Sequence, residues 1–495
     1  MRLGRLLEEA GLPVPGGSEA EAQVTAFAID HRKVAPGTVF GAFQGAAVNG
    51  EDFIGAAVSA GAVAVVSRPE ARVSAALHIA NDNPRAAFAQ LAARFYRPMP
   101  ETVVAVTGTN GKTSTVEMTR QLWRMCGERA ASIGTLGVTT PDGREKTGLT
   151  SPDIVTFLAN MSGLAREGVT HVAFEASSHG LDQHRSEGVP LAAAAFTNFS
   201  RDHLDYHGTM EAYFAAKLRL FTELLEPGAC AVVWDGGDEW SRRVVDAVRE
   251  RGCSLLLVGE GEAADLRLVE RETTQLGQQL SVEHSGRTFN VTLPLIGAYQ
   301  VANALVAAGL AVVTGMEPAR VFDALGRLQP VPGRLERVAI TRAGAPVYVD
   351  YAHTADALEA VIAALRPHAS GRLILVFGAG GDRDAGKRRG MGEAAEAADF
   401  IIVTDDNPRG EDPAAIRAAV LAGLPADPPR VREVGDRREA ITLAIAEAAR
   451  DDIVLVAGKG HEQGQIVGRG DAARVLPFDD VAVARECAAA EGVNA

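Results

Sequence analysis

The sequence predicts an α/β protein built from three domains, and three observations support that fold class. The chain has 495 residues and is too long for a single hydrophobic core. Single domains usually contain roughly 100–200 residues. In its middle and last parts, short apolar runs of the kind that form buried parallel strands end abruptly in polar or glycine-rich loops. Helical patterns lie between most of these runs, as expected of domains with mainly parallel sheets.

Two proline clusters mark the expected joints between the domains. Residues 97–100 (RPMP) separate a helical stretch from a strand, and residues 329–333 (QPVPG) follow another helical stretch. We therefore expect a smaller N-terminal α/β domain over residues 1–97, a central domain over 98–332 and a C-terminal domain over 333–495.

The buried strands are expected where the apolar runs occur. In the central domain the runs lie at residues 103–106, 172–174 and 192–196, and in the C-terminal domain at 347–349, 373–377, 401–403 and 453–456. Ligands of parallel sheets bind beyond the carboxyl ends of the strands. The loops that follow these runs are therefore where we expect the functional residues.

Composition narrows the class of protein. The net charge of −14 disfavours a general role in binding nucleic acid, which needs a basic face. The four cysteines (Cys126, Cys230, Cys253 and Cys487) form no CxxC pattern, so we expect reduced thiols in the core. Charges in residues 1–9 argue against a signal peptide, and no apolar run approaches the ~18 residues of a membrane span. We expect a cytoplasmic protein without membrane insertion.

The first run of the central domain leads into TGTNGKTS at residues 107–114. A strand, a glycine loop, Lys-Thr and a helix together make a phosphate cradle, in which backbone N–H groups face the phosphates. Lys112 would neutralise them, and the Thr113 hydroxyl could ligate magnesium. Val106 stands where the general pattern has glycine, and the alternative is a glycine-rich turn with a solvated lysine. We predict nucleotide binding.

Three further residues of the central domain are candidates for the site. Glu175 ends the run 172–174 and could hold magnesium, or could be a helix cap. His203 follows the run 192–196 and, taken alone, fits a hydrogen-bonded structural residue better than a ligand. Lys217 lies in a helical stretch over residues 211–225, on one face with four apolar or aromatic neighbours: Tyr213, Phe214, Leu220 and Phe221. It either extends to water or is a functional lysine with altered charge or a covalent modification.

The C-terminal domain has three polar loops after predicted strands, at residues 380–384, 405–409 and 458–462. All three could converge on one cleft. Their arginines and a glutamate suit a zwitterion that carries carboxylates and an amine, because arginine pairs bidentately with carboxylate. Alternatively, Asn407 and Pro408 form a turn, and Asp405 or Asp406 caps a helix.

These motifs identify a family resemblance that runs through nearly the whole chain. The chain resembles the Mur ligases of peptidoglycan synthesis, and DNPR resembles the mark of members that add meso-diaminopimelate rather than lysine. The matching segments are TGTNGKTS (107–114), LTSPD (149–153), EASSHGLDQHR (175–185), TNFSRDHLDYHG (197–208), AAKLRLF (215–221), VPGRLE (331–336), VDYAHT (349–354), GGDRDAGKR (380–388), DDNPRGEDP (405–413) and GKGHE (458–462).

The resemblance implies an activity and an architecture. The N-terminal domain would bind the UDP-linked substrate, the central P-loop domain ATP, and a Rossmann-like C-terminal domain the added amino acid. The implied reaction joins meso-diaminopimelate to the D-glutamate γ-carboxylate of UDP-N-acetylmuramoyl-L-alanyl-D-glutamate, through an acyl phosphate and with Mg²⁺. It serves cell wall biogenesis, cell shape and cell division. We expect a monomer with small-molecule substrates.

The resemblance also assigns roles, residue by residue. The catalytic residues would be Lys112, His203 and Lys217, the last as a carbamylated lysine. The magnesium ligands would be Thr113, Glu175, His203 and Lys217. The ATP contacts would be Gly108, Thr109, Asn110, Gly111, Lys112, Thr113, Ser114, Asn303, Arg334, Asp350 and His353. The UDP-substrate contacts would be Thr150, Ser151, Ser177, Gln183 and Arg185. The diaminopimelate contacts would be Arg383, Asp406, Asn407, Pro408, Arg409, Gly458 and Glu462.

The N-terminal domain departs most from the family pattern. His31 stands where many relatives carry serine, and the loop at residues 45–50 lacks the polar side chains that some relatives use. Uracil would then be held by backbone groups or by His31.

Three other functions would fit part of the sequence. A folylpolyglutamate synthase would share the ATP loop but not DNPR or SSHGLDQHR, and a lysine-adding relative would differ at residues 407–409. A nucleotide-binding regulator could keep Lys112 but would not need Glu175, His203, Lys217 and Arg409 together.

Overall fold

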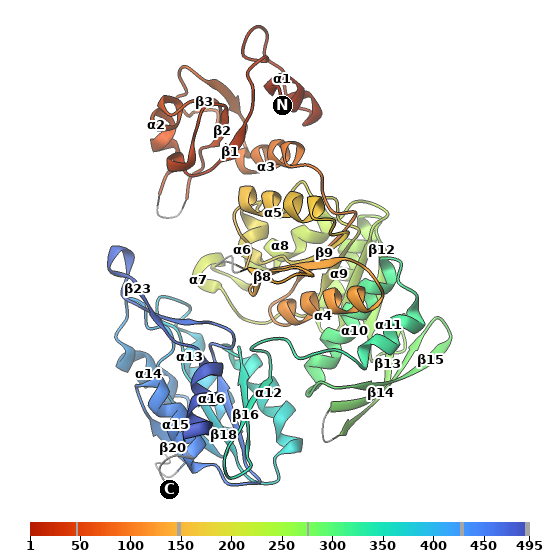
Figure 1. Cartoon of the computed structure of the whole chain (residues 1–495), viewed down its shortest axis with the longest axis vertical. Coiled ribbons are helices and arrows are strands. Elements are labelled where there is room, and N and C mark those ends of the chain that lie inside the picture. Colours follow the sequence, from red (N-terminus) through yellow and green to blue (C-terminus); the bar gives the residue numbers. More distant parts are fainter. Residues whose placement is uncertain (46–47, 146–149, 275–276, 426–429, 491–495) are drawn as a thin grey trace.

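The computed structural model describes residues 1–45, 48–145, 150–274, 277–425 and 430–490. Its strands form three main sheets, one after another along the chain, and a separate two-stranded hairpin (Figure 1). Residues 46–47 of the loop discussed above, and Leu149 of the LTSPD segment, lie outside the described residues. No helix in the described part of the chain has the length and apolar character needed to cross a membrane.

The N-terminal sheet is parallel throughout, as an α/β domain requires. Its strands, in spatial order, are β1 (Ala26–Ala28), β2 (Thr38–Gly41), β3 (Ala62–Ser67) and β4 (Leu77–Ala80). Its helices are α1 (Leu3–Glu9), α2 (Ile54–Ser59), α3 (Pro84–Phe95) and the short 3₁₀ turns His31–Lys33 and Gly50–Phe53. Successive residues of a strand face opposite sides of the sheet, so Val39 packs toward α1 and α3 while Phe40 packs toward α2.

The central sheet is parallel in its middle and antiparallel at both ends. Its strands, in spatial order, are β15 (Arg287–Leu293), β14 (Gly277–His284), β13 (Leu266–Thr274), β12 (Ser254–Gly259), β11 (Cys230–Asp235), β10 (Ala193–Phe196), β5 (Thr102–Thr107), β9 (His171–Glu175), β6 (Ala130–Gly134), β7 (Gly137–Thr139) and β8 (Arg144–Glu145). The predicted runs became β5, β9 and β10. The parallel strands β6, β11 and β12 and the strands β13–β15, β7 and β8 were not predicted. Strands β13–β15 and β8 are partly exposed and lack a continuous apolar run, and β7 has only three residues.

Helices cover both faces of the central sheet, and the phosphate loop follows β5, an interior strand. They are α4 (Lys112–Met125), α5 (Ile154–Arg166), α6 (Ser178–Asp182), α7 (Leu204–His207), α8 (Met210–Arg219), α9 (Glu239–Glu250), α10 (Ala298–Val313) and α11 (Pro318–Leu325). Val104 and Val106 of β5 pack toward α4 and α10, whereas Val103 and Ala105 pack toward α5 and α8.

The helical stretch around Lys217 differs from the single helix expected over residues 211–225. Helix α8 ends at Arg219 and continues as a π-helical turn over Leu220–Leu224. Such turns are uncommon and often occur at functional sites.

The C-terminal sheet is parallel except for its first strand. Its strands, in spatial order, are β16 (Glu336–Ile340), β17 (Pro346–Asp350), β21 (Ile453–Ala457), β18 (Leu373–Phe377), β19 (Phe400–Val403) and β20 (Val431–Glu433), with the hairpin β22 (Gly464–Val467) and β23 (Arg474–Pro477) apart from them. One face packs on α12 (Ala355–Leu365), α13 (Lys387–Ala395) and α14 (Pro413–Leu421), and the other on α15 (Arg437–Glu447) and α16 (Asp480–Ala490). Two 3₁₀ turns, Arg366–His368 and Gly470–Ala472, complete the described elements.

All four cysteines are free thiols. Cys126 and Cys487 are buried, while Cys230 and Cys253 are half-buried, so the expected core location holds for the first two only.

Candidate active site

A cavity of about 480 Å³ lies between the central and C-terminal domains, beyond the carboxyl ends of β5, β9, β10 and β17. Loops that follow those strands supply most of its lining, as expected for open α/β sheets. Fifteen of the residues predicted from the sequence line it: Thr109, Asn110, Gly111, Lys112, Thr113, Ser114, Thr150, Glu175, Ser177, His203, Lys217, Asn303, Arg334, Asp350 and His353.

The phosphate loop is held by the strand next to it. Asn198, just after β10, accepts a hydrogen bond from the backbone N of Asn110 at 2.9 Å, and Thr197 Oγ1 donates to the Asn110 carbonyl at 2.6 Å. Lys112 Nζ donates to the carbonyls of Gly108 at 2.9 Å and Thr109 at 2.7 Å. The alternative of a solvated lysine is therefore wrong. Helix α4 begins at Lys112 and points its N-terminus into the cavity, where the helix dipole favours an anion.

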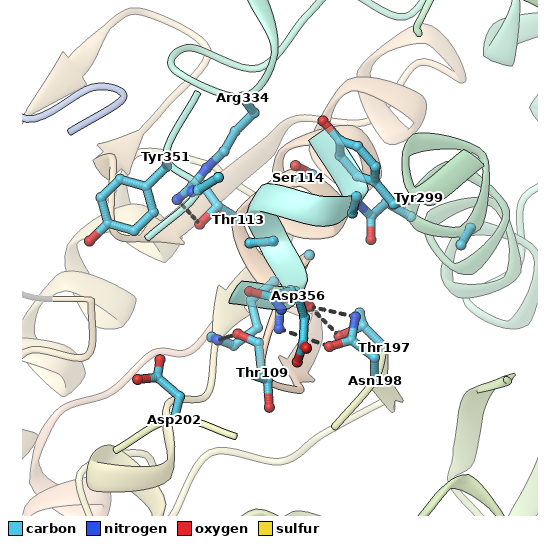
Figure 2. Close-up of a pocket in the computed structure, with 18 of the residues that line it drawn as sticks. Thr109, Thr113, Ser114, Thr197, Asn198, Asp202, Tyr299, Arg334, Tyr351 and Asp356 are labelled. Atoms are coloured by element: carbon cyan, nitrogen blue, oxygen red, sulfur yellow. Dashed lines mark hydrogen bonds between the residues drawn. The ribbon is translucent and has the colours of Figure 1, made fainter. Parts of the chain in front are cut away.

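Arg334 connects the C-terminal side of the cavity to the phosphate loop. Its guanidinium donates to Thr113 Oγ1 at 3.0 Å and lies 4.2 Å from the ring centre of Tyr351 (Figure 2). A guanidinium over an aromatic face is a stabilising cation–π arrangement. Arg334 is thus held beside Thr113, at the end of the phosphate loop where a phosphate would lie.

Glu175 lies at the end of β9 and is directed into the cavity. Its carboxylate accepts hydrogen bonds from Thr135, from the backbone N at 2.7 Å and from Oγ1 at 3.1 Å. It does not cap a helix, since Ser177 is the N-cap of α6. A buried carboxylate held on one side and open to a cavity on the other can still accept a cation.

Residues predicted to contact the UDP-linked substrate form one hydrogen-bonded group beside Glu175. Ser151 Oγ and Ser177 Oγ are 2.9 Å apart. Arg185 donates to the Ser151 carbonyl at 3.1 Å and to Gln183 Oε1 at 2.6 Å. Thr150 and Ser177 line the cavity, whereas Ser151, Gln183 and Arg185 lie behind them.

His203 lies at the N-terminus of α7 in the left-handed backbone conformation, with φ of 53°. Burial lowers its pKa, although the neighbouring Asp202 carboxylate opposes this effect. At neutral pH the ring is therefore uncharged, with a lone pair free for a cation. Burial likewise lowers the pKa of His353 to about 4, with the positive charge of Lys387 as the next cause.

Asp350 is the last residue of β17, and its carboxylate accepts hydrogen bonds from two backbone N–H groups. It accepts from the backbone N of Leu335 at 2.6 Å and of Ala352 at 2.7 Å. Burial raises its pKa to about 6. Asp350 therefore orders the loop that carries Tyr351 and His353 into the cavity.

Lys217 is buried, and only 1% of its surface is exposed. Its Nζ donates to the Gly108 carbonyl at 2.6 Å and lies 4.6 Å from the ring centre of Tyr213. The alternative in which it extends to water is wrong. Burial, and then the nearby charge of Lys112, hold the pKa of its ammonium well below the usual range. A lysine that is readily uncharged is a nucleophile.

The three polar loops of the C-terminal domain converge, as expected from their strands. Asn407 Nδ2 donates to Glu462 Oε2 at 3.0 Å, and Arg409 donates to the Gly381 carbonyl at 2.8 Å. Arg383 is the exception, because its nearest ion-pair partner is Asp205 of the central domain, at 3.9 Å. These loops lie outside the cavity, but Tyr351 Oη donates to Glu462 Oε1 at 3.4 Å and joins the two regions.

The helix-cap alternative for this loop is wrong. Asp412 caps α14, whereas Asp405 pairs with Arg417 and Asp406 with Lys459. Asn407 is buried and hydrogen-bonded at both ends of its amide.

Several residues in the site were not predicted. Tyr351 lies inside the VDYAHT segment and Asn198 inside TNFSRDHLDYHG, so the motifs contained them without assigning a role. Tyr299 also lines the cavity, four residues before Asn303 on α10. The i, i+4 spacing places both on one helix face, which would have identified it.

The donors available to magnesium come from separate elements. In the described part of the chain, no group of three or more His, Cys, Asp or Glu side chains forms a ready metal site. The cavity instead places the Thr113 hydroxyl, the Glu175 carboxylate and the uncharged His203 ring on its wall. Magnesium keeps few protein ligands and completes its shell with water and substrate phosphates, so this sparse set fits it.

Comparison with known proteins shows likeness along nearly the whole chain. Residues 23–96 match the description "Mur ligase family, catalytic domain", residues 106–311 "Mur ligase middle domain" and residues 333–460 "Mur ligase, glutamate ligase domain". A UDP-N-acetylmuramoyl-L-alanyl-D-glutamate--2,6-diaminopimelate ligase of Zymomonas mobilis is 57% identical over 486 residues, 98% of each chain.

Two solved structures extend the comparison to the fold. One of a UDP-N-acetylmuramoyl-L-alanyl-D-glutamate--2,6-diaminopimelate ligase has a TM-score of 0.71 and 32% identity, and covers 99% of this chain and 100% of its own. A folylpolyglutamate synthase of Mycobacterium tuberculosis, complexed with ADP and AMPPCP, has a TM-score of 0.61 at 21% identity. It covers 73% of this chain and 89% of its own. The second likeness shows a shared fold alone.

Proposed function

Because this chain belongs to the Mur ligase family, we propose that it joins meso-diaminopimelate to the D-glutamate γ-carboxylate of UDP-N-acetylmuramoyl-L-alanyl-D-glutamate, with ATP as cosubstrate. It is an ATP-dependent ligase that forms a carbon–nitrogen bond in peptidoglycan precursor synthesis. The observation that carries the substrate assignment is the 57% identity to a ligase of that name over 98% of the chain. The cavity supports it, because the phosphate loop, the candidate dipeptide contacts and the C-terminal domain meet there.

In the first step the γ-carboxylate oxygen attacks the γ-phosphorus of ATP. An O–P bond forms, the bond to the bridging oxygen breaks, and ADP leaves. Phosphoryl transfer depends mainly on positioning and charge neutralisation. Lys112 and Arg334 supply positive charge at the phosphate loop, and the N-terminus of α4 adds backbone donors.

In the second step the uncharged amine of diaminopimelate attacks the acyl phosphate carbon. A C–N bond forms and the bond between the acyl carbon and the bridging oxygen breaks. Phosphate departs with that oxygen, and the proton lost by the amine passes to the departing phosphate or to solvent. Arg409, Glu462 and Arg383 are the charged groups proposed to orient the zwitterionic substrate, with Asp406, Asn407, Pro408 and Gly458 in the same loops. Arg383 must then exchange its pairing with Asp205 for a substrate carboxylate.

Thr113, Glu175 and His203 would hold magnesium. When bound, magnesium neutralises phosphate charge and orients the oxygens that react. The Thr113 oxygen already accepts a hydrogen bond from Arg334, so it would offer its second lone pair. Asn303 and the loop residues 108–114 would contact ATP, and Thr150, Ser151, Ser177, Gln183 and Arg185 the UDP-linked dipeptide.

Lys217 is proposed to be carbamylated. Its low pKa makes the uncharged amine available to react with CO₂, which forms an N–C bond and releases a proton. The product is an anion, which would be attracted to the charge of Lys112 and could bind a second magnesium. This change also explains why a lysine stands on an apolar face.

The domain boundaries at 97/98 and 332/333 remain part of the proposal, as does a cytoplasmic location, where ATP is available. A monomer suffices for this proposal, since one chain supplies every group named above.

The test is phosphate release with ATP, magnesium and UDP-N-acetylmuramoyl-L-alanyl-D-glutamate, with meso-diaminopimelate or L-lysine added separately. Release with diaminopimelate alone, together with the tripeptide product, is the expected result. Turnover with lysine instead would overturn the amino-acid assignment. ATP binding without turnover would favour a regulator or another ligase substrate.

A further inference from the structure

Lys459 is a lysine buried beside the amino-acid-binding loops, and the mechanism above gives it no role. It follows β21 in the GKGHE segment, and its side chain has 0% exposure. Lysine is almost never fully buried unless it is paired, because removing an ammonium from water is costly. The surroundings of Lys459 therefore show what it does.

Three oxygen atoms surround the Lys459 ammonium. Its Nζ donates to Asn407 Oδ1 and to the Gly464 carbonyl, both at 2.9 Å, and lies 3.4 Å from Asp406 Oδ1. Two hydrogen bonds and the ion pair with Asp406 thus surround an ammonium that has three donors and no acceptor. Lys459 is closed to substrate and acts through the groups that it holds.

The contact with Lys459 sets the orientation of the Asn407 amide. Asn407 Oδ1 also accepts from the backbone N of Ile466 at 2.9 Å. Both groups that face this end of the amide are donors, so the end must be the oxygen. The amide nitrogen consequently faces Glu462 and donates to its Oε2 at 3.0 Å.

Lys459 also balances charge around Glu462. Asp406 and Glu462 are both carboxylates near the buried ammonium, and Lys459 Nζ lies 3.9 Å from Glu462 Oε2. Burial, and then the charge of Asp406, raise the pKa of Glu462, whereas Asn407 and Lys459 oppose that rise. Loss of the ammonium would favour a protonated Glu462, which cannot attract a cation.

We propose that Lys459 is a positioning residue for the added amino acid. It orients Asn407 and, through that amide, presents Glu462 as the anion that receives an ammonium group of the substrate. The inference rests on the proposed function, since it requires the added substrate to carry an ammonium group. The Asn407 amide oxygen is occupied by two protein donors, so only its amide nitrogen could contact the substrate in addition to Glu462.

The first experiment compares Lys459→Met with the wild type in the phosphate-release assay, with one substrate varied at a time. Methionine keeps the length of the side chain without a donor or charge. We expect the KM for meso-diaminopimelate to rise at least about tenfold, while the KM values for ATP and the UDP-linked dipeptide change less than about twofold. An equal loss for all three substrates would overturn the proposal.

Arg372→Met is the matched control. Arg372 pairs with the buried Asp452 at 2.8 Å, at the opposite end of β21 from Lys459. Its loss leaves a buried carboxylate of the same sheet without its ion-pair partner, so it tests for general damage to the domain. We expect a lower melting temperature and an unchanged KM for diaminopimelate.

A double-mutant cycle tests whether Lys459 acts through Glu462. In the Glu462→Gln background, Lys459→Met should change the KM for diaminopimelate by no more than about twofold. A tenfold change in both backgrounds would contradict the proposed route.

If Lys459→Met does not fold, Asn407→Asp decides the question. It keeps an acceptor for Lys459 but turns a carboxylate toward Glu462, so the KM for diaminopimelate should rise at least about tenfold. An unchanged KM would overturn the proposal. Failure of the wild type to use diaminopimelate would instead overturn the proposed function, which keeps the two outcomes distinct.

Discussion

Lys217 shows at the scale of a single residue how burial changes chemistry. Its neighbours Tyr213, Phe214 and Phe221 are buried, and the only hydrogen bond described for its ammonium is to the Gly108 carbonyl. An ammonium in such surroundings is poorly solvated, so the uncharged form is favoured. The same burial that packs the helix therefore prepares the amine for a covalent change.

We expect carbamylation of Lys217 to be directly detectable. Wild-type protein incubated with ¹³C-labelled bicarbonate should show a carbamate carbon by NMR, and Lys217→Met should not. The variant should also lose at least about 10²-fold in kcat/KM, because a charged group near the phosphates is removed. Lys33→Met, which removes an exposed lysine, is the control and should keep both the carbamate and the activity.

The histidines of the site predict how stability depends on pH. The pKa of His353 is lowered to about 4, whereas in the unfolded chain it is about 6.5. Between these values the unfolded chain binds more protons than the folded chain, so stability is lost as pH falls from about 6.5 toward 4. His179, whose pKa burial also lowers to about 4, acts in the same direction.

His353→Gln should therefore lose less stability on acidification than the wild type. The measurement is the apparent melting temperature at about pH 7.5 and about pH 5. His368→Gln, at a partly exposed 3₁₀ turn of the same domain, is a control for the removal of a histidine outside the site. An equal acid-induced drop in the wild type and His353→Gln would contradict the assignment.

At the scale of an element, the phosphate loop depends on glycines that no other residue could replace. Gly108 has φ of +146°, and an added Cβ would collide with Thr197 Oγ1. Gly111 has φ of +85°, and its Cβ would collide with Asn303 Oδ1. The loop thus packs against β10 on one side and α10 on the other, which holds its backbone donors in place before ATP binds.

Gly108→Ala should weaken ATP binding at least about tenfold, because it adds both backbone strain and a steric clash. The binding constant can be measured by calorimetry with a non-hydrolysable ATP analogue. Gly163→Ala serves as the control, since Gly163 lies in helix α5 with open space around its Cβ position. Normal ATP binding by Gly108→Ala would show that the loop can rearrange.

At the scale of the whole molecule, two loops bring the central and C-terminal domains together. Arg201 pairs with Asp384 at 3.3 Å, and Lys387 with Asp202 at 3.6 Å. The Lys387–Asp202 pair is largely shielded from solvent, at 12% and 8% side-chain exposure, whereas Arg201 is 56% exposed. Shielded charges interact more strongly than exposed ones, so Lys387–Asp202 is the stronger of these two ion pairs. Closure of these domains would exclude water from the acyl phosphate.

Small-angle scattering should show a decrease in the radius of gyration when an ATP analogue and both substrates are added. Lys387→Met should reduce that decrease, because it removes the lysine that pairs with Asp202 across the domains. Arg366→Met is the matched control, since Arg366 pairs with Asp399 inside the C-terminal domain at 2.5 Å. Absence of compaction in the wild type would contradict domain closure altogether.

Much of the fold and of the site was predictable from local pattern. Buried parallel strands are continuous apolar runs, so the sequence predicts seven of them, and the loops after them contain charged residues of the site. The phosphate loop was equally clear, because its chemistry requires glycines, lysine and a hydroxyl in adjacent positions. The strands β13–β15 of the central sheet were not predicted, since partly exposed strands lack that continuous pattern. The strands β6, β11 and β12 were also missed, although each pairs in parallel with a neighbour.

By itself, the sequence determined the order of elements, the phosphate loop and the family motifs, since each depends on residues close together in the chain. Only the tertiary structure decided the pairings between distant residues. Arg334 reaches Thr113 across 221 positions, and Lys217 reaches Gly108 across 109. Packing between the sheets decides that Lys217 is buried and which way the Asn407 amide points. It also decides that Arg383 pairs with Asp205. Such contacts leave no local period in the sequence, which is why the structure was needed to reveal them.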